Sequence, residues 1–221
     1  EEYSPLGVDE AVIESLLDQV EEASPDVFVP YFAGADQLTL LTQFTERGLK
    51  KHIAVVMGHY DEVMASNLSA EIREGFFSSN TYFMTVDTPS NHDFLARLAK
   101  FPEVTGVWPH GNGTLTNFSE GAYICVKAFA KAANLAGSVE PEALVEVLKT
   151  IDVDAPQGTV QMNPQHHHAR VNTYLSRCGA DGVFDIVESF GTLDPILPER
   201  YSHQVIKQSA TLEEDMRLQA R

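Results

Sequence analysis

The sequence predicts an α/β fold: a parallel, doubly wound sheet with helices on both faces, followed by a C-terminal β-hairpin and a terminal helix. Short unbroken apolar runs at 27–32 and 53–58 are typical of strands buried on both faces. Amphipathic helical patterns alternate with these runs over short connections. Two strand-like segments near the C-terminus are separated by the turn GADG, which indicates an antiparallel hairpin.

The first helix and strand are predicted by a change of apolar period. Residues 9–22 place their apolar side chains on one helical stripe, and Asp9 is the expected N-cap. Pro25 then ends the pattern, and the run VFVPYF at 27–32 is the first expected strand. A second helix follows in DQLTLLTQFTERG and ends at Gly48.

The same alternation continues to residue 88. The run IAVVMG at 53–58 predicts a second buried strand, and the polar segment 59–72 is compatible with a helix. The run TYFMTVDT at 81–88 predicts a third strand. Strand and helix with short connections favour parallel pairing.

Residues 90–151 read as three helices with no strand of their own. The first has Asn91 as its expected cap, the second is SEGAYICVKAFAKAANLAG, and the third has Pro141 near its start. The apolar faces of these three helices must pack against a sheet. Strand patterns return at GTVQMNP, RVNTYLSRC and GVFDIVESF. Because EEYSPLG opens the chain like a strand, we expect that an amino-terminal portion precedes it.

Composition narrows the possible partners. The formal net charge is −17, with 32 acidic and 15 basic residues, so the chain has no basic face for nucleic acid. An acidic surface favours neutral or cationic ligands. No run approaches the length of a membrane span, and the first residues do not form a signal peptide. Cys125 and Cys178 are expected to be buried free thiols, with a disulfide as the alternative.

Three consecutive histidines, His166, His167 and His168, raise the question of a metal site. Adjacent strand residues point to opposite faces, so the three side chains cannot all converge on one ion. A polar strand end or turn is the favoured interpretation, and no metal or cofactor is expected. The chain also has no G-x-S-x-G elbow and no P-loop, so we do not expect an enzyme.

Ligands of open α/β sheets bind beyond the carboxyl ends of the strands. Two such ends carry suitable side chains, with His59 among those after the second strand. Aromatic residues supply an apolar wall, and carboxylates accept N–H hydrogen bonds. The alternative for the aromatic residues is a place in the core. The candidate ligand-binding residues are Tyr31, Phe32 and Gly34 after the first strand, with Tyr60, Asp61 and Glu62 after the second.

The order of these segments resembles the type I periplasmic-binding-protein superfamily. The resemblance is to the branch that holds the amidase-operon amide sensor and the urea or short-chain-amide binding components of ABC transporters. Its most specific part is APQGTVQMNPQHHHAR followed by DGVFDIV. The resemblance implies that the histidines form a hairpin turn of one binding-protein lobe.

Members of this family have two α/β lobes that close on a small ligand. The resemblance implies that 1–87 form part of the second lobe, 88–152 a helical section of the first, 153–200 a return to the second, and 201–221 a C-terminal helix or linker. The first-lobe sheet would then be largely missing from this chain. The implied hinge residues are Asp87, Thr88, Pro89, Asp152, Ala155 and Pro156.

The resemblance implies non-catalytic binding of a short-chain amide, urea or amino acid. The expected partners are that ligand and a transporter permease or a downstream signalling module, and an extracytoplasmic location is expected with a cytoplasmic one as the alternative. Two other roles stay open: a ligand-controlled interaction regulator such as an amide-responsive antiterminator binder, and the sensory domain of a signalling kinase. The tail is either a solvated helix or the start of a signalling coiled coil.

Overall fold

The computed structural model describes residues 7–32, 34–165 and 167–196. Over these residues the strands form one sheet in the order β1-β2-β3-β6-β5-β4, and β7 pairs with β6 beside this path. The predicted α/β class is confirmed, but the sheet is mixed and not parallel throughout. Only β1, β2 and β3 are parallel, because β3 pairs antiparallel with β6 and the strands after it are joined by hairpins.

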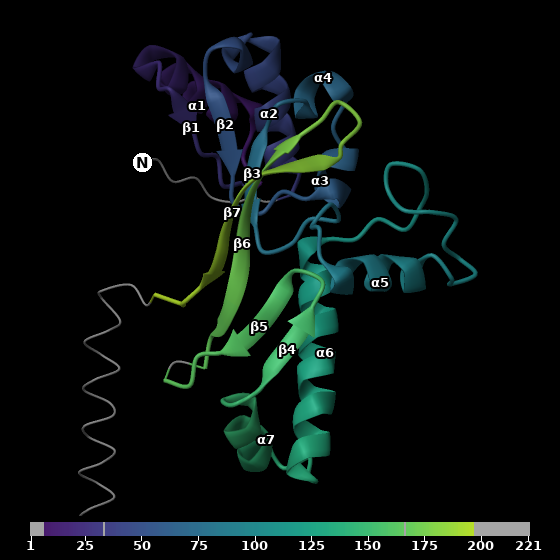
Figure 1. Ribbon diagram of the computed structural model, residues 1–221. Helices are drawn as coiled ribbons and strands as arrows, with labels where there is room; N and C mark the ends of the chain where they lie inside the picture. The colour runs from purple at the N-terminus through teal and green to yellow at the C-terminus, as the bar shows by residue number, and fades with distance from the viewer. Residues whose placement is uncertain (1–6, 33, 166, 197–221) are drawn as a thin grey trace, which may run out of the picture.

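Two bodies follow one another along the sheet (Figure 1). The upper body comprises residues 7–86 together with 174–190 of the last hairpin, and the lower body comprises 117–171. Strand β6 runs from one body into the other. The elements of the first 80 residues are α1 Glu10–Ala23, β1 Val27–Phe28, α2 Ala35–Glu46, η1 Leu49–Lys51, β2 Ala54–Met57, α3 Glu62–Ser66, α4 Ala70–Arg73 and β3 Phe77–Asn80.

The helices of the upper body form where the apolar period predicts them. In α1 the side chains of Ile13 and Leu17 are buried, and they join the same core cluster as the buried face of α2. Asp9 occupies the N-cap position of α1, although its side chain accepts no capping hydrogen bond. Gly48 lies just past α2 with a φ of 74°, the left-handed conformation that glycine adopts without strain.

The predicted strand at 81–88 is wrong, and the strand lies just before it. Strand β3 has the polar sequence FSSN, in which Ser78 and Asn80 are buried because both donate hydrogen bonds to the carbonyl of Tyr60. Residues 81–88 are irregular although their apolar side chains are buried. Side chains satisfy the backbone there: Asn91 Nδ2 donates to the carbonyls of Met84 and Val86, at 3.0 and 2.7 Å.

The remaining elements are α5 Pro89–Leu98, α6 Asn117–Ala136, α7 Pro141–Leu148, β4 Asp152–Ala155, β5 Gly158–Met162, β6 Ala169–Cys178 and β7 Phe184–Leu193. The three helices and the last three strands match the predicted segments. The cap of α5 differs, because the Thr88 side chain accepts from Asn91 N and Asn91 itself lies inside the first turn.

The lower body has a small core of its own. One face of α6 packs through Ile124 on Val153, Ala155 and Val160 of the β4–β5 hairpin. We expect residues 153–200 in the second lobe, yet the structure shows that 153–162 pack against α6 in the lower body. The assignment of the segments to lobes of a longer protein stays a prediction.

Both predicted hairpin turns form. Residues 179–182 join β6 to β7, and residues 163–168 join β5 to β6, with Met162 opposite Ala169. His167 has a φ of 54°, as expected of a turn residue, whereas His166 lies outside the described residues. The predicted tail helix at 201–221 and most of EEYSPLG also lie outside them.

The two cysteines are free, as predicted, but only Cys178 is buried and Cys125 is exposed on α6. Within the described ranges, no helix is long and apolar enough to cross a membrane.

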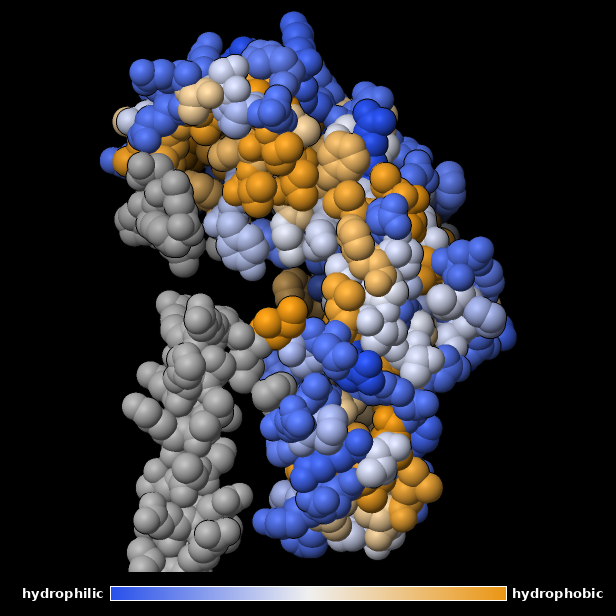
Figure 2. Space-filling model, turned by 60° about the vertical axis from the view of Figure 1, so that its left-hand side comes forward, coloured by the Kyte–Doolittle hydropathy of each residue, from blue (hydrophilic) through white to orange (hydrophobic). Residues whose placement is uncertain are grey.

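Figure 2 shows apolar side chains on the face of the upper body among hydrophilic ones. Exposed apolar residues of β1 and its vicinity include Val27 and Val29.

Candidate functional site

The candidate ligand edge lies where β1 and β2 end. The rings of Tyr31 and His59 are 4.6 Å apart between centroids and tilted by 51°. The Tyr31 side chain is 76% exposed, so it is not the core residue that the alternative interpretation required. The ring lies over Gly58, where a Cβ would stand 3.5 Å from it, an ordinary van der Waals distance. The pair presents an open aromatic face at the carboxyl edge of the parallel strands.

His59 is a polar residue of this edge that the candidate set above omits. Burial lowers the pKa of its imidazole, partly offset by the Asp61 charge, so the ring is neutral near pH 7. Its Nδ1 is buried and has no hydrogen-bond partner among the described residues. A neutral imidazole offers one donor and one acceptor, so it can recognise an N–H or a C=O group. Its position directly after β2 was the signal for it.

Asp61 is buried and structural in this chain. Its side chain is fully buried, Oδ1 accepts from Met64 N at the start of α3, and Oδ2 accepts from Asn117 N at the start of α6. Burial raises the pKa of this carboxyl, and the backbone N–H donors oppose the shift. One carboxylate therefore caps two helices that are 56 residues apart in sequence.

Glu62 is also buried, with 2% of its surface exposed. Its Oε1 accepts a 2.8 Å bond from Met84 N in the irregular segment after β3. Burial raises the pKa of the carboxyl to about 7, against the lowering effect of the backbone donors. Tyr60 is buried beside these acids, and burial raises the pKa of its phenol to about 12. The structure thus places Tyr60, Asp61 and Glu62 inside the upper body, behind the open aromatic pair.

Phe32 and Gly34 shape the loop that leads into α2. The Phe32 amide donates to Oε1 of Gln37, a buried side chain whose Nε2 contacts Met57 Sδ at 3.3 Å. Gly34 precedes α2 with a φ of 63°, and no atom lies within 4 Å of the place where a Cβ would stand. The hydrogen bond to Gln37 ties the loop to the core, whereas the space beside the Gly34 Cα is empty. A ligand can therefore approach the Gly34 backbone.

A second buried carboxylate, which the sequence did not single out, lies in the lower body. Glu120 in the first turn of α6 accepts from the amide N and the Nε2 of Gln157, at 3.2 and 2.9 Å. Burial raises the pKa of Glu120 to about 7. The Tyr174 hydroxyl donates to the Gln157 carbonyl at 2.7 Å, so this cluster joins α6, the β4–β5 turn and β6.

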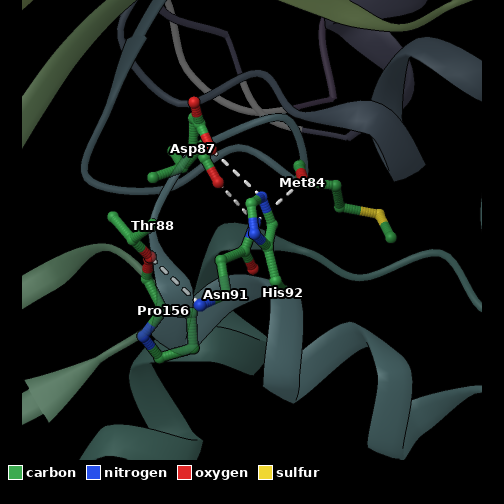
Figure 3. A network of polar contacts seen from close by, with 7 residues as sticks. Met84, Asp87, Thr88, Asn91, His92 and Pro156 are labelled. Carbon is green, nitrogen blue, oxygen red and sulfur yellow. Dashed lines mark hydrogen bonds and ion pairs between the residues drawn. The ribbon is translucent and has the colours of Figure 1, made fainter.

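The two predicted crossing segments are in direct contact (Figure 3). Thr88 Oγ1 donates to the Pro156 carbonyl at 2.7 Å and also accepts from Asn91 N. His92 Nε2 lies 3.1 Å from Asp87 Oδ1 on the exposed surface beside them. Pro89 begins α5, and Asp152 and Ala155 bound β4. The contact places the two candidate hinges side by side, and their role in motion stays a prediction.

Two other features do not belong to this edge. A cleft of about 380 Å³, lined by Lys50, Lys51, Arg177 and neighbouring residues, opens at the amino-terminal ends of β2 and β3. Over the ranges that the structure describes, no group of three or more His, Cys, Asp or Glu side chains is arranged to hold a metal ion.

Comparison with known families fits this architecture. The model of a family described as periplasmic binding protein domain matches residues 1–207. The chain belongs to this family. The fold of this periplasmic binding protein domain agrees with the family match. The resemblance to the type I periplasmic-binding-protein superfamily, drawn from the sequence, is confirmed at the level of the superfamily.

Three solved structures similar to this periplasmic binding protein domain are distant from it in sequence. An amino acid ABC transporter substrate-binding protein from Pseudomonas fluorescens Pf-5 has 19% identity and a TM-score of 0.74, with 88% of this chain and 51% of that chain covered. A solute-binding protein from Rhodopseudomonas palustris BisB5, in complex with 3,4-dihydroxybenzoic acid, has 18% identity and a TM-score of 0.64, with 84% and 49% covered. A branched-chain amino acid transporter protein from Rhodopseudomonas palustris CGA009 has 20% identity and a TM-score of 0.65, with 89% and 53% covered.

This periplasmic binding protein domain spans about half the length of those structures. At such identities the likeness establishes the fold alone. It does not distinguish the amide-sensor branch from the branches that bind amino acids or aromatic acids.

Proposed function

We propose that this protein binds a small solute at the carboxyl ends of β1 and β2 without transforming it, as the solute-binding component of an ABC transporter. The observation that carries the proposal is the exposed Tyr31 ring set against the neutral His59 at that edge. Family membership supports it. The proposed partners are the solute and a transporter permease, and the proposed location is extracytoplasmic.

The chemistry of this edge favours a planar, neutral group over an ammonium. Asp61 and Glu62 are buried and accept backbone N–H bonds, so an ammonium could reach them only by breaking those bonds. A planar amide, a urea or an aromatic ring can stack on Tyr31 and bond to His59. We therefore rank a short-chain amide or urea, and an aromatic acid through its planar ring, above an amino acid, whose ammonium needs a free carboxylate of the protein.

Closure of the two bodies around the solute is the proposed output. A ligand that contacts both bodies shifts the equilibrium between open and closed forms by its differential affinity. The crossings at Asp87–Pro89 and Asp152–Pro156 are the proposed hinges, and the contact between Thr88 and Pro156 supports this assignment.

The test is calorimetric titration of the natural full-length protein with acetamide, urea, benzoate, 4-hydroxybenzoate and leucine. Tyr31→Ala is expected to weaken binding of the solute that binds by about tenfold, roughly 1.4 kcal/mol, because it removes the stacking face. Val29→Ala is the control, since Val29 is exposed on the same segment. Unchanged affinity of Tyr31→Ala would remove this edge from the binding site.

Asp61 and Glu62 need a separate test because their loss also disturbs folding. Asp61→Asn keeps one acceptor oxygen but turns an N–H donor toward the other helix-start amide, so it should lower the Tm. If Asp61 supports the edge without touching solute, the folded variant should retain most of the affinity. A complete loss of affinity in Asp61→Asn, measured at a temperature at which this variant is still folded, would assign Asp61 to direct contact with the solute.

A further inference from the structure

The long connection between α5 and α6 reaches back to the upper body. Residues 99–116 leave the end of α5 and return to the start of α6, as Figure 1 shows in teal. Val107 and Leu115 of this connection pack against the core of the upper body. Trp108, the only tryptophan of the chain, lies against the turn between β6 and β7.

The contact of Trp108 is closely fitted on two sides. A Cβ on Gly182 would lie 3.0 Å from the indole, tighter than an ordinary contact, and the φ of 86° there also favours glycine. The Arg73 guanidinium stands 5.8 Å from the ring centroid. Arg73 is itself held, because its Nε donates to the Ala180 carbonyl at 2.9 Å and Nη1 donates to the Leu68 carbonyl at 3.2 Å. Trp108 therefore meets a fixed cation and a fixed turn of the upper body.

The segment that carries Trp108 is a compact loop that closes on itself. Asn112 Oδ1 accepts from the Thr105 amide, and Asn112 Nδ2 donates to the Glu103 carbonyl at 2.7 Å. The Gly113 amide donates to the Gly106 carbonyl at 2.8 Å. A Cβ at Gly113 would lie 2.5 Å from that carbonyl oxygen, so the close approach of the two ends of the loop depends on glycine. The loop is therefore a compact unit held by its own contacts.

The loop leads directly into the helix on which the lower body is built. Thr116 caps α6, and Asn117 N donates to Asp61 of the upper body at 3.0 Å. Asn117 Oδ1 accepts from Thr81 Oγ1 at 2.7 Å. The start of α6 is thus tied to the upper body at its first residue and again through the loop at Trp108.

We propose that Trp108 is a positioning residue that sets the angle between the two bodies, by holding the α5–α6 loop against Arg73 and the Gly182 turn. This role of Trp108 rests on the proposed function in one respect: the angle matters for binding because the solute would lie between the two bodies. Release of Trp108 frees the loop, and the start of α6 then keeps only its anchors at Asp61 and Thr81, about which the helix can pivot. A residue that served only the core would change stability without changing that angle.

The test measures the separation of two dyes, one in each body. Cys125 is exposed on α6 and takes one dye, Lys51→Cys on the upper body takes the other, and Cys178 is protected because burial raises the pKa of its thiol to about 12. Trp108→Ala is expected to broaden and shift the distribution of separations. Trp108→Phe, which keeps a ring beside Arg73, is expected to restore the native distribution, and Phe101→Ala at an exposed site is the control. An unchanged distribution in Trp108→Ala overturns the proposal.

A measurement on the unmutated protein covers the case in which Trp108→Ala fails to fold. With a single tryptophan, acrylamide quenching of the emission reports how accessible the Trp108 ring is in its contact with the upper body. Quenching well below that of N-acetyltryptophanamide is expected, and quenching as strong as that of the free compound overturns the proposal. Neither measurement uses a solute, so failure here is distinct from failure of the proposed function.

Discussion

Glu62→Gln is expected to remove a large part of the pH dependence of stability. The Glu62 carboxyl is 2% exposed and accepts a bond from Met84 N, and burial raises its pKa to about 7 from an ordinary value of 4.5. A folded-state pKa above the unfolded value means that the folded protein binds the proton more tightly. The contribution to stability is therefore complete below about pH 4.5 and is lost as the pH rises through about 7.

The size of the effect follows from the shift. A difference of about 2.5 pKa units at 1.36 kcal/mol per unit corresponds to ~3 kcal/mol. Glutamine keeps an oxygen that can accept from Met84 N and carries no charge to bury. Native protein and Glu62→Gln should therefore be similar in stability near about pH 5, and the variant should be the more stable near about pH 8.

The assay is urea denaturation of both proteins at these two pH values, with Glu22→Gln as control because Glu22 is exposed on α1. The native protein is expected to lose ~2.5 kcal/mol more between the two values than Glu62→Gln loses, and Glu22→Gln should follow the native protein. Equal losses in native protein and Glu62→Gln would refute the burial argument.

Three further substitutions test the packing and the crossings, each by urea denaturation. Asn91→Ala should cost about 2–4 kcal/mol, because it leaves the buried Tyr82 hydroxyl and two carbonyls without their partner. Thr88→Val should cost about 1–2 kcal/mol, since it removes the cap of α5 and the bond to the Pro156 carbonyl. Phe44→Ala should cost about 3–5 kcal/mol, because the ring is fully buried in the upper core.

An exposed asparagine and an exposed phenylalanine on α6 provide the controls for Asn91→Ala and Phe44→Ala. Asn134→Ala and Phe129→Ala remove side chains that lie mostly in solvent, so each should change stability by less than about 0.5 kcal/mol. Losses as large as those of Asn91→Ala and Phe44→Ala would mean that burial does not set the cost.

Elements with a strong local period were predictable from the sequence. The stripe through Ile13 and Leu17 gave α1 within one residue at each end, and the turn GADG predicted the β6–β7 hairpin. Strand β3 was missed because its buried positions, Ser78 and Asn80, are polar. Their partner is the carbonyl of Tyr60, which no local pattern reveals.

The site was predictable in place but not in detail. The rule for open sheets led to the strand ends, and Tyr31 is exposed there. Burial of Asp61 and Glu62 was not predictable, because it depends on Asn117 and Met84, which are 56 and 22 residues away. Spacing within one segment cannot show that a carboxylate is already used by a distant backbone amide.

The most direct test of solute binding is thermal unfolding of the natural full-length protein with acetamide, urea, benzoate, 4-hydroxybenzoate or leucine. A solute at about a hundred times its dissociation constant should add roughly 2.7 kcal/mol, a rise of several degrees in Tm. The account predicts a selective rise with one planar solute. A rise with leucine alone would contradict the ranking of ligands, and no rise with any of the five would contradict the proposed binding of this class of solute.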